Sequence, residues 1–293
     1  MSQAPRTVAI WWIRRDLRLT DNQALQAALR AADQVLPVFI LDGRLLDSEY
    51  SGEKRRQFLF ASLAALDQAL RQRGSRLILR LGNPIEELTR LLQESQVQGI
   101  FAEPDYSPFA RQRDLRAAAS LPIQWAGSPS FHPPGSVLKA DGSPYTVFTP
   151  FSKAWKALPL PAPLQLRLSE IPFHIDPTVH SEPLPDLPYP PAFFPGEAEA
   201  ARRLGDFMAG PVETYAEDRN RLDLSGTSML SPYLRFGMLS PRRAVQAALQ
   251  ASSDLPVEFR RGAETFLNEL IWREFYQSIL YHFPHVLQGA FNT

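Results

Sequence analysis

The stretch Thr7-Val8-Ala9-Ile10-Trp11-Trp12-Ile13 decides the fold class of this 293-residue chain. Its residues are apolar or β-branched, without the alternation of a strand that has one solvated face. Such a run is typical of a parallel strand that is buried on both sides. Four more runs of this kind alternate with helical segments, which predicts an α/β fold with a doubly wound, five-stranded parallel sheet. The other strands are expected at 35–41, 76–81, 99–102 and 122–125, and the helices at 23–32, 53–73, 84–95 and 108–119.

The character of the sequence changes twice further along. Residues 131–196 are rich in proline and lack sustained periodicity, apart from a short helix through Trp155, as is typical of an extended connector. From Glu197 onward the pattern is helical. We therefore predict an α/β domain over 1–130, a long Pro-rich linker over 131–196 and an all-α segment over 197–293. Its helices are expected at 197–207, 212–221, 241–251 and 257–283.

Composition narrows the class of protein. The net charge is zero, from 31 Lys and Arg against 31 Asp and Glu, so nucleic acid must bind through local clusters rather than an overall basic field. The chain has no cysteine, which excludes disulfides, thiolate metal sites and a cysteine nucleophile. No signal pattern opens the chain, and no apolar run reaches membrane-spanning length. A soluble, cytoplasmic protein with no membrane partner and no metal site is expected.

In a doubly wound sheet, ligands bind outside the carboxyl ends of the strands. Charged residues follow these ends here, among them Arg15, Asp42 and Glu103. Neither a Gly-x-Gly-x-x-Gly turn nor a phosphate-binding P-loop follows any strand, so ordinary dinucleotide or triphosphate binding is not predicted. Two interpretations stay open: a ligand held by Arg, Asp and rings, or charges that only tie loops and helices together.

A helix near the end of the chain has an unusual face. The stretch Phe266–Tyr276 lacks Gly and Pro and is predicted as helix. Four of its side chains are spaced i, i+3, i+4 and i+7 and so share one face. Together they can hydrogen-bond a polar ring edge, stack on a base and pair with a phosphate. The same spacing fits a core helix whose Trp packs and whose Glu and Arg pair at the surface. The four residues are Glu269, Trp272, Arg273 and Tyr276.

The loop Gly226–Ser231 is a second candidate site. It carries three hydroxyls just before a helix expected near Pro232. Hydroxyls and the amides of a helix N-terminus can bind phosphate oxygens. Arg273 could supply positive charge and Tyr215 a ring beside them. A capped loop without a ligand is the alternative.

Three motifs, in order, resemble the photolyase/cryptochrome family. Trp12–Asn22 resembles its opening signature, and Gly226–Leu234 with Gly237–Ser240 resembles its flavin-phosphate loop. Asn268–Tyr276 resembles its substrate-facing helix, in the form typical of class I cyclobutane pyrimidine dimer photolyases. The resemblance implies light-driven repair of pyrimidine dimers in DNA by electron transfer from reduced FAD. The protein would then be a monomeric carbon–carbon lyase, with a sheet domain that binds an antenna chromophore.

The resemblance also assigns residues. Glu269 would hydrogen-bond a thymine edge of a flipped dimer, and Trp272 would stack beneath it. Arg219 would approach a DNA phosphate, Tyr276 would contact DNA, and Arg273 would meet the flavin diphosphate. The rest of the flavin site would be formed by Tyr215, Thr227, Ser228, Met229, Leu230 and Ser231.

The antenna and the extent of the flavin domain follow from the same resemblance. Phe109-Ala110 stands where folate-binding members usually carry Asn-Glu, so a deazaflavin or flavin antenna is expected rather than folate. Its candidate contacts are Arg15, Asp42 and Arg56. The family's flavin domain continues beyond residue 293, so residues 197–293 would be its incomplete start, and the 293-residue chain would bind FAD weakly or not at all. A cryptochrome-type blue-light photoreceptor and an inactive antenna module are the alternatives; Glu269 with Trp272 favours repair.

Overall fold

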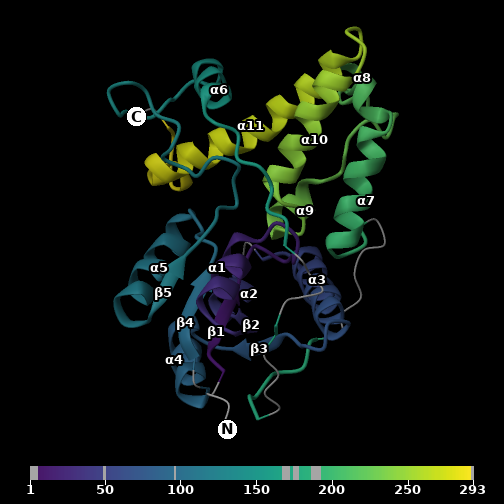
Figure 1. Ribbon diagram of the computed structural model, residues 1–293. Coiled ribbons are helices and arrows are strands. Elements are labelled where there is room, and N and C mark those ends of the chain that lie inside the picture. Colours follow the sequence, from purple (N-terminus) through teal and green to yellow (C-terminus); the bar gives the residue numbers. More distant parts are fainter. Residues whose placement is uncertain are drawn as a thin grey trace.

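A five-stranded parallel sheet forms the first part of the molecule, as predicted (Figure 1). The computed structural model describes residues 6–48, 51–95, 97–166, 172–173, 178–185 and 193–291. The strand order is β3-β2-β1-β4-β5, which places β1 at the centre, and all six of its residues are buried. The strands are β1 (Val8–Ile13), β2 (Gln34–Leu41), β3 (Ile78–Leu81), β4 (Val97–Ala102) and β5 (Ile123–Trp125).

Helices cover both faces of the sheet. Alternate residues of β1 point to opposite sides, so Trp11 packs in the core that α1 and α3 share, whereas Trp12 packs in the core that holds α4. The predicted bounds agree to within about two residues at most ends. Strand β3 begins later than predicted because the amide of Leu77 donates to Asp67 Oδ1 at 2.8 Å instead of joining the sheet. The helices of this part are α1 (Gln23–Ala31), α2 (Gly43–Leu46), α3 (Glu53–Arg71), α4 (Pro84–Glu94) and α5 (Pro108–Ser120).

The later part of the connector, where residues 172–173 and 178–185 are described, lies beside β2 and β3. The amide of Val35 donates to the Pro172 carbonyl at 3.0 Å, and the amide of Glu182 donates to the Leu79 carbonyl at 2.8 Å. These bonds agree with an extended chain wrapped over a surface. The remainder of the predicted linker, at 167–171, 174–177 and 186–192, lies outside the described residues.

The last part of the chain is helical, as predicted, and the long helix α11 crosses it (Figure 1). Gly262 lets α11 approach α8 closely, because a Cβ there would lie 2.6 Å from the carbonyl oxygen of Glu213. Within the described ranges, no helix combines the length and apolarity needed to span a bilayer. The elements of this part are α7 (Glu197–Met208), α8 (Pro211–Asp218), α9 (Ser231–Phe236), α10 (Pro241–Asp254), α11 (Arg260–His282) and η2 (Pro284–Leu287), and the connector contains α6 (Phe148–Ala157).

The apolar core crosses the predicted domain boundary. One cluster of buried side chains contains Trp11 from the sheet and Ile271 from α11. The ring of Phe58 on α3 meets Tyr233 and Phe236 of α9 edge-on, with centroids 5.8 and 5.6 Å apart. The sheet and the helical segment are therefore packed on one another, and the boundaries at 130 and 196 stay a prediction.

Candidate functional site

Helix α11 presents the face that its spacing predicts. Glu269, Trp272 and Arg273 are partly exposed, and 63% of Tyr276 is exposed. The opposite side of the helix is buried in the core. The side chains on that buried side are Leu267, Leu270, Ile271 and Phe275.

Each side chain on this face already has a partner in the free protein. Arg219 donates to Glu269 Oε1 at 2.6 Å, and each of these two side chains is about one-third exposed (30% and 35%). The ring of Phe148 on α6 stacks on Trp272 with centroids 3.6 Å apart and planes 5° apart. The alternative interpretation of this helix was that its Trp packs and its Glu forms an ion pair. Both contacts are present.

Arg273 lies where positive charge is concentrated. It donates to the Leu234 carbonyl at 3.3 Å, and burial lowers its pKa to about 10. Repulsion from Arg15, together with burial, likewise lowers the pKa of Arg235 to about 10. Asp105 lies 3.1 Å from Arg15, and the carboxylates of Glu274 and Glu103 act on Arg273. An anionic ligand would relieve the repulsion among the three guanidinium groups.

The loop at 226–231 packs on the end of α8. A Cβ on Gly226 would lie 2.7 Å from the Cβ of Asp218, so only glycine permits this approach to the last residue of α8. Tyr215 is buried in a cluster of three rings with Phe207 and Phe266. The tyrosine is therefore fixed by packing on α8 before any ligand arrives.

Unpaired polar groups lie in the same loop. In the described part of the chain, no hydrogen bond involves the hydroxyls of Thr227, Ser228 or Ser231, so they are available to a ligand. Met229 adopts a left-handed conformation, with φ of 51°, and Leu230 is buried. Helix α9 has only six residues and no side-chain cap, so the expected contribution of a helix N-terminus is small. If this loop binds the phosphates of a ligand, the three hydroxyls and Arg273 would therefore make most of the contacts.

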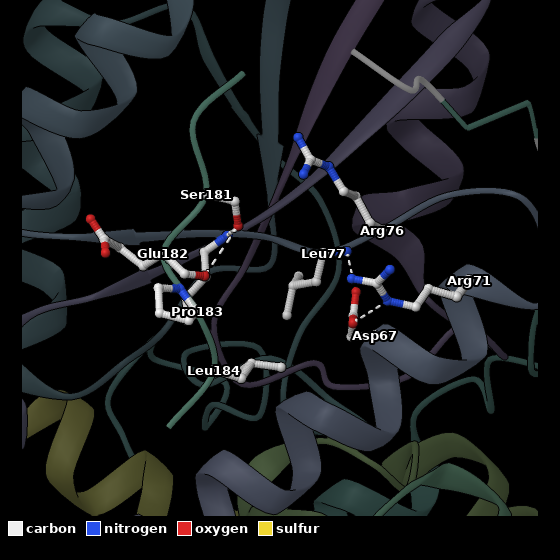
Figure 2. A pocket seen from close by; sticks show the side chains of 9 residues that line it. Asp67, Arg71, Arg76, Leu77, Ser181, Glu182, Pro183 and Leu184 are labelled. Carbon is white, nitrogen blue, oxygen red and sulfur yellow. Dashed lines mark hydrogen bonds and ion pairs between the residues drawn. The ribbon is translucent and has the colours of Figure 1, made fainter. Parts of the chain in front are cut away.

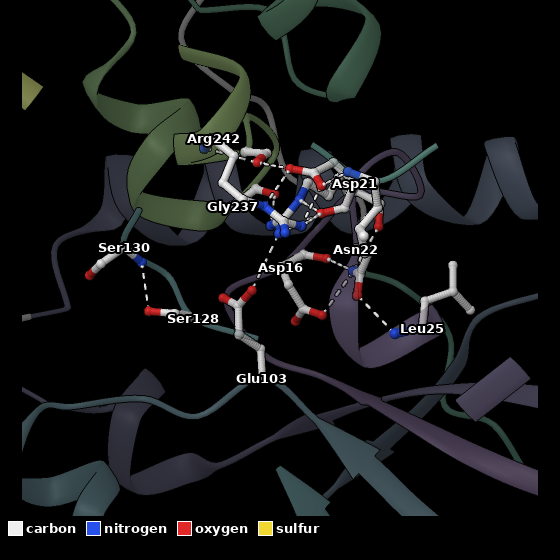
Figure 3. A network of polar contacts seen from close by, with 12 residues as sticks. Asp16, Asp21, Asn22, Leu25, Glu103, Ser128, Ser130, Gly237 and Arg242 are labelled. Atoms are coloured by element: carbon white, nitrogen blue, oxygen red, sulfur yellow. Dashed lines mark hydrogen bonds and ion pairs between the residues drawn. The ribbon is translucent and has the colours of Figure 1, made fainter. Parts of the chain in front are cut away.

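The carboxyl ends of β1 and β4 are covered by the turn after α9. The amide of Leu17 donates to the Phe236 carbonyl at 3.2 Å, and Arg18 Nη1 donates to the Gly237 carbonyl at 3.0 Å. Arg242 of α10 pairs with buried Asp21 (Figure 3). At these two strands the charged residues tie the sheet to the helical segment rather than line an open ligand cleft.

The three antenna candidates have protein partners. Arg15 bonds to Asp105 and, at 3.2 Å, to the Arg235 carbonyl. Asp42 caps α2 and accepts two bonds from the Arg44 side chain, at 2.9 and 2.7 Å, and Arg56 reaches the Leu46 carbonyl at 3.4 Å. Asp42 and Arg56 thus bind opposite ends of α2. The antenna assignment stays a prediction.

Glu274 is a key residue that the helical spacing did not single out. It is buried on α11 and accepts hydrogen bonds from the amides of Phe131 and His132 and, at 2.6 Å, from the indole nitrogen of Trp155. Burial raises its pKa, although the three donors oppose that rise. The sequence does contain a sign of this role, because Glu274 is a carboxylate on the apolar side of the predicted helix, next to Phe275. Through these three hydrogen bonds, Glu274 attaches the start of the connector and α6 to α11.

Glu103, where the sheet meets the helical segment, makes the stability of the protein depend on pH. It is buried and pairs with Arg18 at 3.3 Å (Figure 3), and burial raises its pKa from 4.5 to about 7. Between these values the folded protein binds more protons than the unfolded chain, so its stability falls as pH rises. Relative to a Glu103→Gln variant, we expect a loss of about 3 kcal/mol in the free energy of unfolding between pH 4.5 and 7. Urea titrations of both proteins across this range measure it, and a constant difference would contradict it.

A cavity of about 310 Å³ lies elsewhere, between α3, the edge of β3 and the connector (Figure 2). Its polar groups are satisfied within the protein: Arg71 pairs with Asp67 at 2.6 Å, and Ser181 Oγ accepts from the Leu79 amide at 3.0 Å. The cavity is therefore not a candidate site, and none of its lining residues belongs to α11. No cluster of three or more potential metal ligands occurs among the described residues.

The chain is similar to known proteins of one family. A model of the DNA photolyase family matches residues 9–166, more than half of the chain. The deoxyribodipyrimidine photo-lyase of Synechococcus sp. PCC 6301 is 34% identical, over 97% of this chain and 62% of the relative. A class III photolyase structure from Agrobacterium tumefaciens superposes with a TM-score of 0.87 at 30% identity, over 99% of this chain and 62% of the other. An archaeal photolyase structure from Sulfolobus tokodaii, with two FAD molecules, superposes with a TM-score of 0.75 at 28% identity, over 97% and 62%.

These matches confirm the family and the fold that the three motifs predict, whereas the class within the family stays a prediction. The chain spans about three fifths of the length of the photolyases it matches. Its sheet, its helical segment and its order of motifs all lie within that shared part. The chain belongs to the DNA photolyase family.

Proposed function

We propose that this chain supplies the lesion-facing helix and one wall of the FAD site of a light-driven lyase that splits cyclobutane pyrimidine dimers in DNA. The observation that carries the proposal is the face of α11, where partly exposed Trp272 lies one turn after Glu269. An indole for stacking and a carboxylate for a base edge, side by side, suit a base that has left the helix. A flipped dimer has that form, and it pairs poorly within DNA.

Energetics favour such an exchange at this face. Flipping a poorly paired lesion costs a few kcal/mol, and stacking on an aromatic ring returns about 1–3 kcal/mol per base. The ion pair of Arg219 with Glu269 is part-exposed and contributes about 0–1 kcal/mol, so it can be broken at little cost. Glu269 would then accept from the thymine edge, while Arg219 would turn to a backbone phosphate. Tyr276 would contact the DNA beside them.

The residues present fit a flavin with a diphosphate. Three unpaired hydroxyls lie in the loop at 227–231, and Arg273 adds a partly buried positive charge near Arg15 and Arg235. Tyr215 and Leu230 would form an apolar side of the site, and Met229 would complete the loop. Reduced FAD, when bound, supplies the electron that opens the dimer on absorbing light. The protein's own part is to hold the flavin and the lesion on neighbouring sides of α11.

We also propose a second, light-harvesting chromophore of deazaflavin or flavin type on the sheet domain, in a monomeric protein. Phe109-Ala110 supports a chromophore other than folate. The Sulfolobus tokodaii structure, with its two FAD molecules, supports the flavin type. Arg15, Asp42 and Arg56 are the proposed contacts, and mass spectrometry of the released chromophore tests its identity.

Repair is tested with the full-length gene product, with reduced FAD bound. Irradiated oligothymidine should lose its dimers under blue light and keep them in the dark. Bound, photoreducible flavin without dimer loss would contradict repair and favour a photoreceptor. A chromophore on the sheet domain without bound flavin would favour the antenna module.

Trp272→Ala is expected to weaken binding of a dimer-containing oligonucleotide by about 1–3 kcal/mol, the range for one lost stacking contact. Binding of the undamaged oligonucleotide should not change, because its bases stay stacked in the duplex. Fluorescence anisotropy with both oligonucleotides measures the difference. Equal losses for the two would contradict the role of Trp272.

Arg219→Ala is the matched control, because it removes a phosphate contact rather than a base contact. It should weaken binding of both oligonucleotides alike and reduce the salt dependence of binding by about one phosphate contact. The slope of log Kd against log salt concentration measures this. A loss confined to the damaged oligonucleotide would instead place Arg219 at the lesion.

A further inference from the structure

Two rings contact the partly exposed indole of Trp272. Phe148 stacks on it almost parallel, with centroids 3.6 Å apart, and Tyr276 lies 5.5 Å away with planes 25° apart. Within the described residues, Phe148 and Tyr276 make no ring contact with each other, although two rings on one face of the indole at these distances would touch. They therefore flank Trp272 on different sides. Phe148 packs against the apolar core, whereas 63% of Tyr276 is exposed, so Phe148 occupies the side nearer the core.

The position of Phe148 is set by contacts of α6 that do not involve its ring. Trp155, further along α6, donates to buried Glu274 at 2.6 Å. Phe151 packs on Phe275 at 5.3 Å, and Lys156 donates to Asn268 Oδ1 at 2.9 Å. Helix α6 is thus fastened to α11 at several points. These contacts hold Phe148, the first residue of α6, in a fixed position against the indole of Trp272.

We infer that Phe148 is a positioning residue for lesion recognition, which rests on the proposed function. A surface indole on a helix has several rotamers, and a base can stack only when the indole lies in the correct plane. Phe148 holds that plane and closes one face, so a flipped base would approach from the other side, where the ring of Tyr276 is exposed and more distant, with centroids 5.5 Å apart. Ordering the side chain in advance reduces the entropy lost on binding.

Phe148→Leu tests this, because it keeps an apolar side chain and removes the stack. The ratio of the Kd for an undamaged oligonucleotide to that for one with a single thymine dimer should fall roughly three- to tenfold, the value of one ordered side chain. Phe148→Tyr, which keeps the ring, should restore the ratio. Phe194→Leu, at an exposed phenylalanine before α7, is the control and should leave it unchanged.

Fluorescence gives a readout that needs no DNA. Trp11, Trp12 and Trp155 are at most 1% exposed, so acrylamide quenching reports mainly on the remaining Trp272 and Trp125. Phe148→Leu should increase quenching, and the increase should vanish in a Trp272→Phe background. A double-mutant cycle should likewise show that Phe148→Leu changes the Kd ratio only when Trp272 is present.

The outcomes separate the inference from the function on which it rests. If Trp272→Ala abolishes the preference for damaged DNA and Phe148→Leu keeps it, the inference about Phe148 fails and the proposed function stands. If Trp272→Ala leaves the preference unchanged, the proposed function fails, and the role of Phe148 with it.

Discussion

Gly237→Ala is expected to lower the free energy of unfolding by about 4 kcal/mol, from a strained backbone and a clash together. Gly237 follows α9 with φ of 71°, a conformation that costs other residues about 1–2 kcal/mol. A Cβ there would overlap the carbonyl oxygen of Arg15 and lie 2.7 Å from the Cα of Asp16. Both obstacles are backbone atoms, so no side-chain rotation can relieve them.

The clash would also separate the two parts of the protein where they are tied together. The turn must move away from the sheet, which stretches the bond from the Leu17 amide to the Phe236 carbonyl and the bond from Arg18 to the Gly237 carbonyl. Urea denaturation followed by circular dichroism measures the loss. Gly142→Ala is the matched control, because Gly142 has φ of 80° and open space around it, and it should cost only about 1 kcal/mol. Equal losses for the two variants would show that the contact with Arg15 contributes nothing.

Glu274→Leu is expected to cost about 3–5 kcal/mol, because it leaves three buried donors without an acceptor. These are the amides of Phe131 and His132 and the indole of Trp155. Leucine fills much of the same volume, so lost packing is a minor part of the effect. Denaturant titration at neutral pH gives the size of the loss.

The same variant should release the connector locally. Proteolysis within residues 139–147 should become faster, because α6 loses its main attachment to α11. Glu264→Leu, an exposed position on the same helix, should change stability by less than about 0.5 kcal/mol and leave proteolysis unchanged. A loss below about 1 kcal/mol for Glu274→Leu would mean that water or a rearranged backbone replaces the carboxylate.

Much of the fold could be predicted because hydrophobic patterning is local. The continuous apolar run at residues 7–13 fixed the buried central strand, and the alternation of strands and helices fixed the parallel sheet. Strand β3 began late because a side chain from α3, Asp67, took the amide of Leu77. Such long-range competition for a backbone group leaves no periodic signal.

The candidate site was predicted less completely, because its contacts come from distant parts of the chain. Spacing alone placed Glu269 and Trp272 on one face of α11. It could not show that Arg219 pairs with one and Phe148 stacks on the other, since those partners lie 50 and 124 residues away. The sequence also could not show that the ends of β1 and β4 are covered. The turn at 236–240 covers them through packing between segments that lie far apart in the chain.

The core that runs from β1 through α3 to α9 also limits how this protein can be rearranged by recombination. Phe58 on α3 contributes to the interior of both parts through its contacts with Tyr233 and Phe236. A chimaera that joined this sheet to the helical part of a relative would inherit a mismatched interface unless the facing residues of α3 were exchanged too. Crossovers between the connector and α7 should therefore yield folded hybrids only when the two parents agree at these aromatic positions.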